Sequence, residues 1–107
     1  MISEAEIEEA VNFLESSAVT AAMKRAERIY LEEYKKTVKA TVMLKYADAS
    51  VAAQERNALA SREYQDILSA MKTAIEEDEK IRFLRIAAEA KIEAWRSLNA
   101  NYRAIKV

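Results

Sequence analysis

The chain has 107 residues, of which 51% are hydrophobic and 33% are charged, and its formal net charge is −1 at pH 7. It contains no Gly, Pro, Cys or His. It therefore lacks the residues that tight positive-φ turns, phosphate-binding glycine loops, disulfides and imidazole chemistry require. The length fits one domain. The composition excludes most folds built from β-strands and β-hairpins and favours an all-α protein.

Without Gly or Pro, the helices have to end at Ser, Asp or Asn, whose short side chains compete for backbone hydrogen bonds. Ser3 followed by Glu6 is a capping box, which predicts a short first helix over about 4–14. The pair Ser16-Ser17 predicts a break, followed by a long helix over about 17–46. The polar segment 48–50 and Ser61 then bound a short helix over about 51–59, and a very long helix follows over about 62–104.

The last helix has the clearest hydrophobic periodicity. Its apolar residues recur at alternating steps of three and four, which predicts a continuous seam packed against another helix. Polar residues interrupt the seam at Asp78, Arg85 and Asn99, where they are expected to fix register or partner at some cost in stability. The predicted seam consists of Tyr64, Ile67, Met71, Ala74, Asp78, Ile81, Arg85, Ala88, Ile92, Trp95, Asn99 and Tyr102.

The helix over 17–46 is less regular. Its best stripe at helical spacing consists of Met23, Ala26, Tyr30, Tyr34, Val38 and Val42. Leu31 and Leu44 lie off this stripe, so the helix is expected to bury more than one face. The simplest closure is a single all-α domain of coiled-coil-like character, built as a long antiparallel helical hairpin with a short N-terminal helix and a short helix in the bend.

Charge and length both bear on assembly. Residues 1–15 sum to −5 and residues 81–107 to +4, which favours the antiparallel order. A final helix of roughly 64 Å cannot be covered by one partner helix of ~30 residues. We therefore expect a homodimer along the C-terminal seam, anchored by Ile92, Trp95 and Tyr102. The alternative is a monomer whose last helix kinks or frays near Asn99.

The residue types argue against catalysis. The chain has neither His nor Cys, so it offers no ordinary base near neutral pH and no soft metal ligand. The acidic run from Glu76 to Glu79 points in four directions on a helix and cannot converge on one ion. We predict no catalytic residues, no metal site and no cofactor, and we interpret the run as a solvated face with Asp78 on the seam.

Grouped cations give a candidate nucleic-acid contact, because such residues can neutralise phosphates. The residues are Lys24, Arg25, Arg28, Arg82 and Arg85. The alternative is that these cations balance neighbouring carboxylates such as Glu32 and Glu33. The net charge of −1 and the isoelectric point near 5.6 favour this alternative over a dedicated DNA-binding role.

No apolar run approaches the ~20 residues that span a bilayer, and the acidic N-terminus has no basic region followed by an apolar stretch. The mixed charges on the polar helix faces disfavour binding flat on a membrane. The sequence therefore predicts a cytoplasmic protein that does not contact membranes.

Two segments resemble small, helical, phage-encoded proteins of about this length. The first runs from Val51 through Glu55-Arg56 to Tyr64, although its spacing between Val51 and Glu55 differs from the family's pattern. The second is the family's C-terminal pattern Glu-x-Trp-Arg-Ser-x-x-Ala-x-x-Arg, which spans Glu93 to Arg103 here. Genes of this family tend to lie beside phage genes for single-strand annealing, recombination and replication.

The resemblance implies an accessory role in phage DNA metabolism, in the cytoplasm of an infected bacterial cell, and no defined activity. The first hypothesis is a non-enzymatic accessory protein that binds a recombination or replication protein, with weak direct DNA contact left open. The expected partner-binding residues are Arg56, Tyr64, Trp95, Arg96 and Arg103, unless they serve packing alone. Two further hypotheses stay open: a small helical inhibitor or adaptor of a host protein, and a purely structural oligomerisation module.

Overall fold

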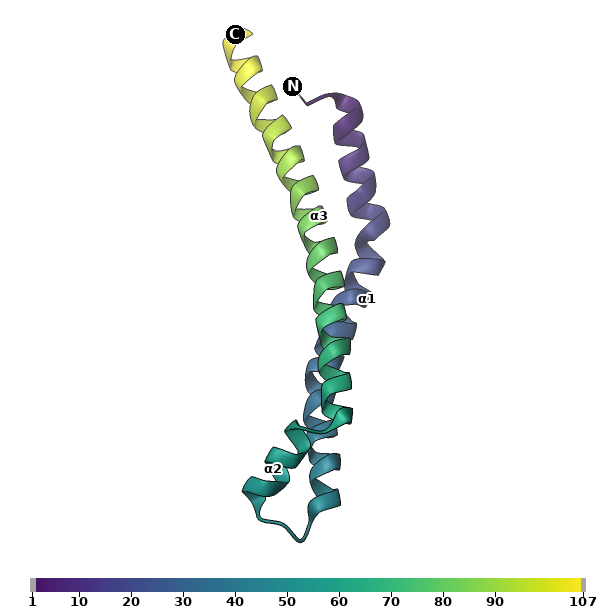
Figure 1. Cartoon of the computed structure of the whole chain (residues 1–107). Helices are drawn as coiled ribbons and strands as arrows, with labels where there is room; N and C mark the ends of the chain where they lie inside the picture. Colours follow the sequence, from purple (N-terminus) through teal and green to yellow (C-terminus); the bar gives the residue numbers. More distant parts are fainter. Residues whose placement is uncertain (1, 107) are drawn as a thin grey trace. The chain divides into compact units, whose positions relative to one another are not determined.

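The computed structural model describes residues 2–106 and contains helices α1 (Glu4–Met43), α2 (Val51–Leu59) and α3 (Arg62–Lys106), with a 3₁₀ turn η1 (Leu44–Tyr46) between α1 and α2. No strand occurs between residues 2 and 106. Figure 1 shows the path of the chain from α1 through the bend into α3. The predicted all-α helical hairpin is confirmed.

Serine side chains start the helices, as expected for a chain without Gly or Pro. The Ser3 Oγ accepts a hydrogen bond from the Glu6 amide at 3.2 Å. The Ser50 Oγ accepts one from the Ala53 amide, also at 3.2 Å, and so caps α2. The Ser61 Oγ accepts the Tyr64 amide at 3.2 Å at the start of α3. Each hydroxyl satisfies an amide that has no partner within its helix.

The predicted break at Ser16-Ser17 is wrong, and so is the separate short helix over 4–14. α1 continues through both serines and ends at Met43, where η1 takes over. The Ser16 hydroxyl donates to the Phe13 carbonyl at 3.4 Å, and the Ser17 hydroxyl accepts from Arg85 at 2.7 Å. Both hydroxyls therefore find partners without ending the helix.

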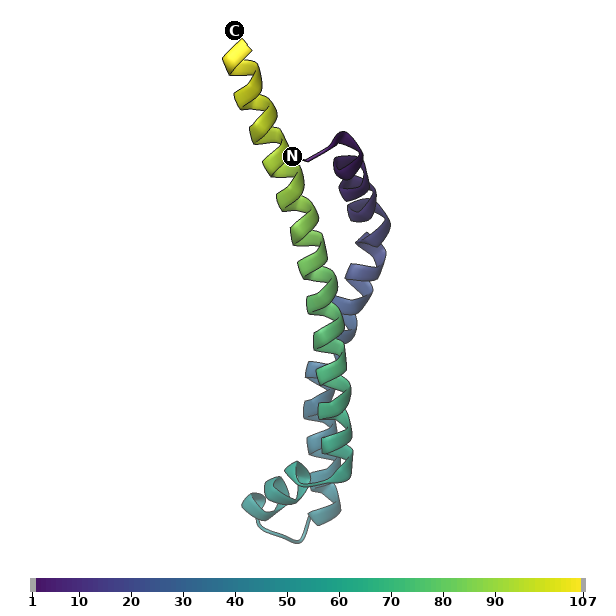
Figure 2. The same cartoon turned by 45° about the horizontal axis from the view of Figure 1, so that its top comes forward.

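The chain divides into two compact units, and each unit contains part of α1 and part of α3. Unit 1 contains Met1–Ala22 and Glu79–Val107, and unit 2 contains Met23–Asp78. Within unit 2, Lys24 pairs with Glu77 and Lys45 with Glu63, which establishes antiparallel order. Figure 2 shows α2 folded beside the end of α1 in this unit.

The interior of unit 2 is small and, apart from the buried Asp78, apolar. Leu31 from α1 packs with Ile67 and Ala74 from α3, and Val38, Tyr64 and Met71 pack against this cluster. Val42 and Ala58 are also buried. In unit 1 the buried residues are Ile7, Ala10, Ser17 and Ala88. No large side chain is fully buried among the described residues, so alanines make up much of the interior.

The seam predicted for α3 agrees with the burial pattern. Every seam residue from Tyr64 to Asn99 is buried or half-buried, including the polar exceptions Asp78, Arg85 and Asn99, whereas Tyr102 is exposed. The sequence therefore contained enough information to place the packed face of a helix 45 residues long.

The stripe predicted for α1 is largely wrong. Val38 and Val42 lie inward, but Met23, Ala26, Tyr30 and Tyr34 are exposed. The actual seam also takes alternating steps of three and four, but it carries long cations with aliphatic stems, two of which, Lys24 and Arg28, reach carboxylates. It consists of Ile7, Ala10, Leu14, Ser17, Ala21, Lys24, Arg28, Leu31, Lys35, Val38 and Val42.

The bend carries a titratable contact that can be tested. The pKa of Glu63 lies below its usual 4.5. The larger cause is a hydrogen bond from the Glu63 backbone amide, and the second is the Lys45 ammonium group 3.1 Å from the carboxylate. Because the folded pKa is lowered, this carboxylate stabilises the bend fully above about pH 4.5, and the contribution is lost as pH falls through the lowered pKa. We expect a carboxyl-carbon NMR titration to show the lowered pKa and Lys45→Met to raise it; an unchanged pKa in that variant would contradict the contact.

Candidate protein-binding surface

An open hollow of about 590 Å³ lies in unit 1 against the C-terminal part of α3. Trp95 and Asn99, both half-buried, come from the seam of α3, and Glu4 comes from the first turn of α1. The structure thus brings together three of the predicted partner-binding residues, Trp95, Arg96 and Arg103. The lining consists of Glu4, Glu93, Trp95, Arg96, Ser97, Asn99, Ala100, Tyr102 and Arg103.

Antiparallel register explains why Glu4 joins these residues. The Arg85 guanidinium donates to the Leu14 carbonyl and to the Ser17 Oγ, each at 2.7 Å. Both helices rise 1.5 Å per residue, so moving eleven residues along α3 to Arg96 reaches the level of the start of α1. Glu4 was not predicted because the hydrophobic pattern does not fix this register, although Arg85 on the seam was the signal that could have done so.

The rim of the hollow carries charges of both signs. Arg96 donates to Glu93 at 3.2 Å, and both side chains are exposed. An exposed pair one helical turn apart contributes little stability, in the range of 0–1 kcal/mol, so a partner's carboxylate can compete for the guanidinium. Trp, Tyr and Arg are also the residue types that most often dominate binding energy at protein interfaces.

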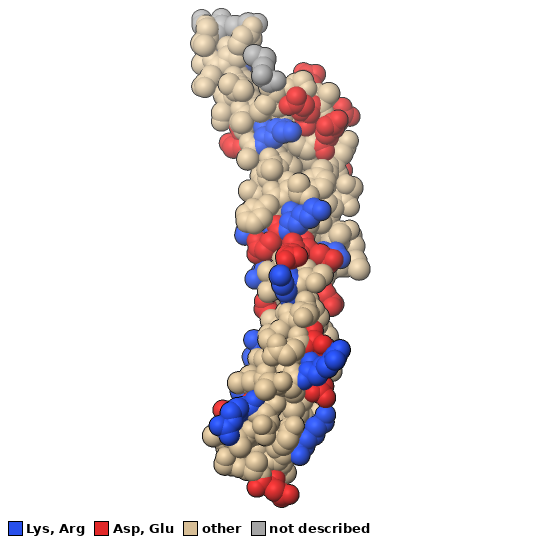
Figure 3. Space-filling view, in the orientation of Figure 1, with Lys and Arg blue, Asp and Glu red and all other residues tan. Residues whose placement is uncertain are grey.

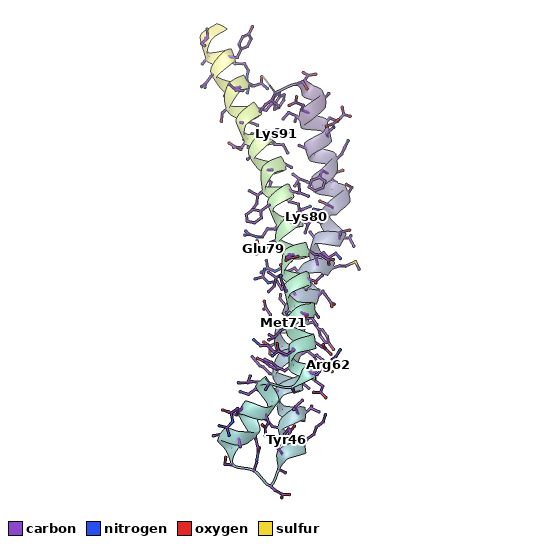
Figure 4. The ribbon with its side chains drawn as sticks, in the orientation of Figure 1. Tyr46, Arg62, Met71, Glu79, Lys80 and Lys91 are labelled. Carbon is purple, nitrogen blue, oxygen red and sulfur yellow. The ribbon has the colours of Figure 1, made fainter. Side chains whose placement is uncertain are left out.

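A second groove of about 280 Å³ follows the α1–α3 contact inside unit 1. Its apolar lining includes Ala10, Phe13 and Leu84, and its charged lining consists of Glu6 and Glu9 from α1 and Lys91 from α3. Lys91 is labelled in Figure 4. The full lining is Glu6, Glu9, Ala10, Phe13, Leu84, Ala87, Ala88 and Lys91.

The other predicted partner-binding residues belong to unit 2. Arg56 lies exposed on α2, and its carbonyl accepts the Ala60 amide at 3.1 Å. Tyr64 is half-buried and packs against the Leu31–Ile67–Ala74 cluster. Tyr64 therefore has a packing role in the start of α3, whereas the Arg56 side chain reaches solvent.

The predicted nucleic-acid residues are mostly engaged within their own units. In unit 2, Lys24 contacts Glu77 at 2.8 Å, and Arg28 contacts Asp78 at 3.3 Å and Glu32 at 3.1 Å. In unit 1, Arg82 contacts Glu79 at 2.8 Å and lies 4.8 Å from the Phe83 ring centroid. Arg85 donates hydrogen bonds to the Leu14 carbonyl and the Ser17 hydroxyl. Arg25 is exposed.

Charges of both signs alternate over the face shown in Figure 3, with apolar and neutral surface between them. This agrees with the pairing above, in which Glu77, Asp78 and Glu79 each meet a cation. The acidic run is therefore less solvated than expected, because three of its four carboxylates form ion pairs.

The residues predicted for self-association differ in exposure. Ile92 and Trp95 are half-buried seam residues of unit 1, whereas Tyr102 is exposed. Among residues 2–106 no three His, Cys, Asp or Glu side chains gather in a way that could hold a metal ion. None of the helices within that range has the length and apolar character to cross a membrane.

Comparison of the chain with protein-family models, curated proteins and solved structures gives no match. The geometry of the chain's own surface is therefore the basis for a functional proposal.

Proposed function

We propose that the chain is a non-enzymatic accessory protein that acts by binding another protein through the hollow at the C-terminal part of α3. The observation that carries this proposal is the hollow itself, which gathers Trp95, Arg96, Tyr102 and Arg103 on one open surface. Its size falls within the 300–1,000 Å³ typical of binding sites.

The chemistry of the hollow indicates what it would bind. Two aromatic rings, two guanidinium groups and two carboxylates suit a helix or peptide with an apolar anchor and flanking charges of both signs. The residue that fills the hollow would contact Trp95, while acidic groups beside it would meet Arg96 and Arg103. An uncharged small molecule would make no use of these charges.

The resemblance of residues 93–103 and of the bend to phage-encoded proteins supports a role in DNA recombination or replication, in the cytoplasm of an infected bacterial cell. In this proposal the partner is a recombination or replication protein. Direct DNA contact is secondary and weak, because Lys24, Arg28 and Arg82 already meet carboxylates.

The test places a photo-crosslinking residue at Tyr102 in phage-infected cells, with the same residue at the exposed Ile29 of unit 2 as the matched control. We expect a recombination or replication protein to be crosslinked from position 102 and not from position 29. Arg96→Glu with Arg103→Glu should reduce the yield about tenfold or more, as expected for interface residues worth over 1 kcal/mol.

Other outcomes distinguish the alternatives. Crosslinking of a host protein from position 102 would support the inhibitor or adaptor hypothesis and overturn the recombination role. Crosslinking of this chain alone would support the oligomerisation module. Equal yields at positions 102 and 29, or no product, would reject the hollow as a binding surface.

A further inference from the structure

α1 carries a second stripe in unit 2 that neither α3 nor α2 covers. Its residues recur at steps of three or four, so they share one side of the helix. Leu44 is the first residue of η1 and continues the helical backbone, since Met43 before it has φ −56° and ψ −35°. The stripe consists of Met23, Ala26, Tyr30, Tyr34, Thr37, Thr41 and Leu44, all exposed.

The composition of this stripe sets it apart from the rest of α1. Nine of the 22 residues from Met23 to Leu44 are charged, and none of the nine falls on the stripe. Exposed faces of soluble helices are normally polar, and an uncharged stripe at helical spacing is typical of a face that packs against another helix. The stripe is therefore a second packing face.

Tyr30 and Tyr34 form the centre of the stripe. Their rings stack with centroids 5.7 Å apart and planes within 9°. Single-stranded nucleic acid also stacks on such rings, but Glu27 and Glu33 lie three residues from Tyr30 on either side and would repel phosphates. A protein surface fits this pair better than a nucleic acid does.

We propose that the occupant of this stripe is α1 of a second copy of the chain, running antiparallel. The spacing supports this choice because six of the seven stripe residues mirror one another about the point between Glu33 and Tyr34, while Tyr34 lies next to that point and mirrors Glu33. Met23 mirrors Leu44, Ala26 mirrors Thr41 and Tyr30 mirrors Thr37, each pair of residue numbers having the same sum. A twofold interface requires such self-complementarity, since residue i then meets j while j meets i.

Side-chain sizes agree with this register. Tyr30 of each copy meets the small Thr37 of the other, and the small Ala26 and Thr41 face one another. The two Tyr34 rings lie next to the twofold axis, and Met23 and Leu44 close the two ends. The Tyr30–Thr37 contacts place a large residue against a small one, which is the arrangement that lets the side chains of facing helices interdigitate.

The area is sufficient for a weak dimer. The stripe is roughly 33 Å long, and a helix is about 10–12 Å wide, which gives a footprint of roughly 350 Å² on each copy. Met23, Tyr30, Tyr34 and Leu44 are 65%, 60%, 42% and 76% exposed, so most of this footprint is open to burial. Together the two footprints cover roughly 700 Å², below the ~1,200 Å² at which stable specific interfaces begin, so the dimer is weak and depends on concentration.

Sedimentation equilibrium tests the dimer directly. We expect the apparent mass to rise from 12.1 kDa toward twice that value between about 1 and 500 µM. Tyr30→Arg with Tyr34→Arg should keep the monomer mass throughout, with unchanged helicity by circular dichroism. The matched control Ile29→Arg, at an equally exposed apolar residue off the stripe, should dimerise like the wild type.

Cysteine crosslinking tests the antiparallel register, because the chain has no cysteine of its own. Under mild oxidation a mixture of Met23→Cys and Leu44→Cys proteins should form the mixed disulfide at least tenfold faster than either protein forms its own. Faster self-coupling of Met23→Cys would overturn the antiparallel order.

Three results would overturn the proposal: a monomer at all these concentrations, a dimer that survives Tyr30→Arg with Tyr34→Arg, or a dimer abolished by Tyr102→Arg, which would place the contact at the C-terminal part of α3. The inference does not depend on the proposed function. The hollow can bind a partner whether or not α1 dimerises, and each set of variants leaves the other surface intact.

Discussion

Leu31→Ala should destabilise the protein by about 2–4 kcal/mol, whereas Tyr30→Ala, one residue earlier, should cost about 0.5 kcal/mol. Leu31 is 9% exposed and packs with Ile67 and Ala74, so its truncation removes buried methyl groups and leaves a cavity. Tyr30 is 60% exposed, and its loss removes one ring stack. Urea unfolding at low micromolar protein concentration measures both.

Comparison of the Leu31→Ala and Tyr30→Ala variants tests which side of α1 faces α3. The stripe predicted from sequence buries Tyr30 and leaves Leu31 off the main packed face, whereas in the structure Leu31 is buried and Tyr30 is exposed. A larger loss of stability for Tyr30→Ala than for Leu31→Ala would show that the predicted stripe, and not the observed seam, faces α3.

Asp78→Ala should cost about 2–3 kcal/mol through loss of the contact with Arg28. The Asp78 side chain is 11% exposed, and its Oδ2 accepts from the Arg28 Nη1 at 3.3 Å. Removing one partner leaves the other charge in the seam without its counterion. Arg28 is more exposed and also contacts Glu32, which places the expected cost below that of a fully buried pair.

The control for this prediction is Glu93→Ala, which breaks the exposed pair with Arg96 and should change stability by less than about 0.5 kcal/mol. Asp78→Leu combined with Arg28→Leu should recover most of the loss, because two apolar residues on a seam need no counterion. If the double variant were as unstable as Asp78→Ala, the ion pair would not be the cause.

The fold was predictable where one physical signal dominated. The seam of α3 is apolar at most positions, so periodicity found it, and Ser3, Ser50 and Ser61 started helices as their cap chemistry indicates. The expected break at Ser16-Ser17 is absent because both hydroxyls find partners inside a continuous helix, Ser16 at the Phe13 carbonyl and Ser17 at Arg85. Arg85 lies 68 residues away from Ser17 in the chain, and no local rule detects such a contact.

The prediction of the α1 seam failed for a related reason. Lys24, Arg28 and Lys35 lie at seam positions, and hydrophobic periodicity discounts such residues. Tyr30 and Tyr34 gave a stronger apolar signal on the wrong side. That signal was real, and it indicates the second packing face of α1. Of the candidate site, sequence found Trp95, Arg96 and Arg103, while Glu4 required the register of two helices.

The small interior of the two units has a thermodynamic consequence. Alanine fills many buried positions, and the seam of α1 also holds a buried serine together with half-buried lysine and arginine side chains. Unfolding therefore exposes less apolar surface per residue than in an average domain, and apolar exposure sets the heat capacity of unfolding. A heat capacity below the usual ~12–15 cal/mol/K per residue makes the stability curve flat. Binding a partner or a second copy would bury apolar area that the chain alone leaves in water. This would raise the heat capacity of unfolding and make the stability curve more strongly curved.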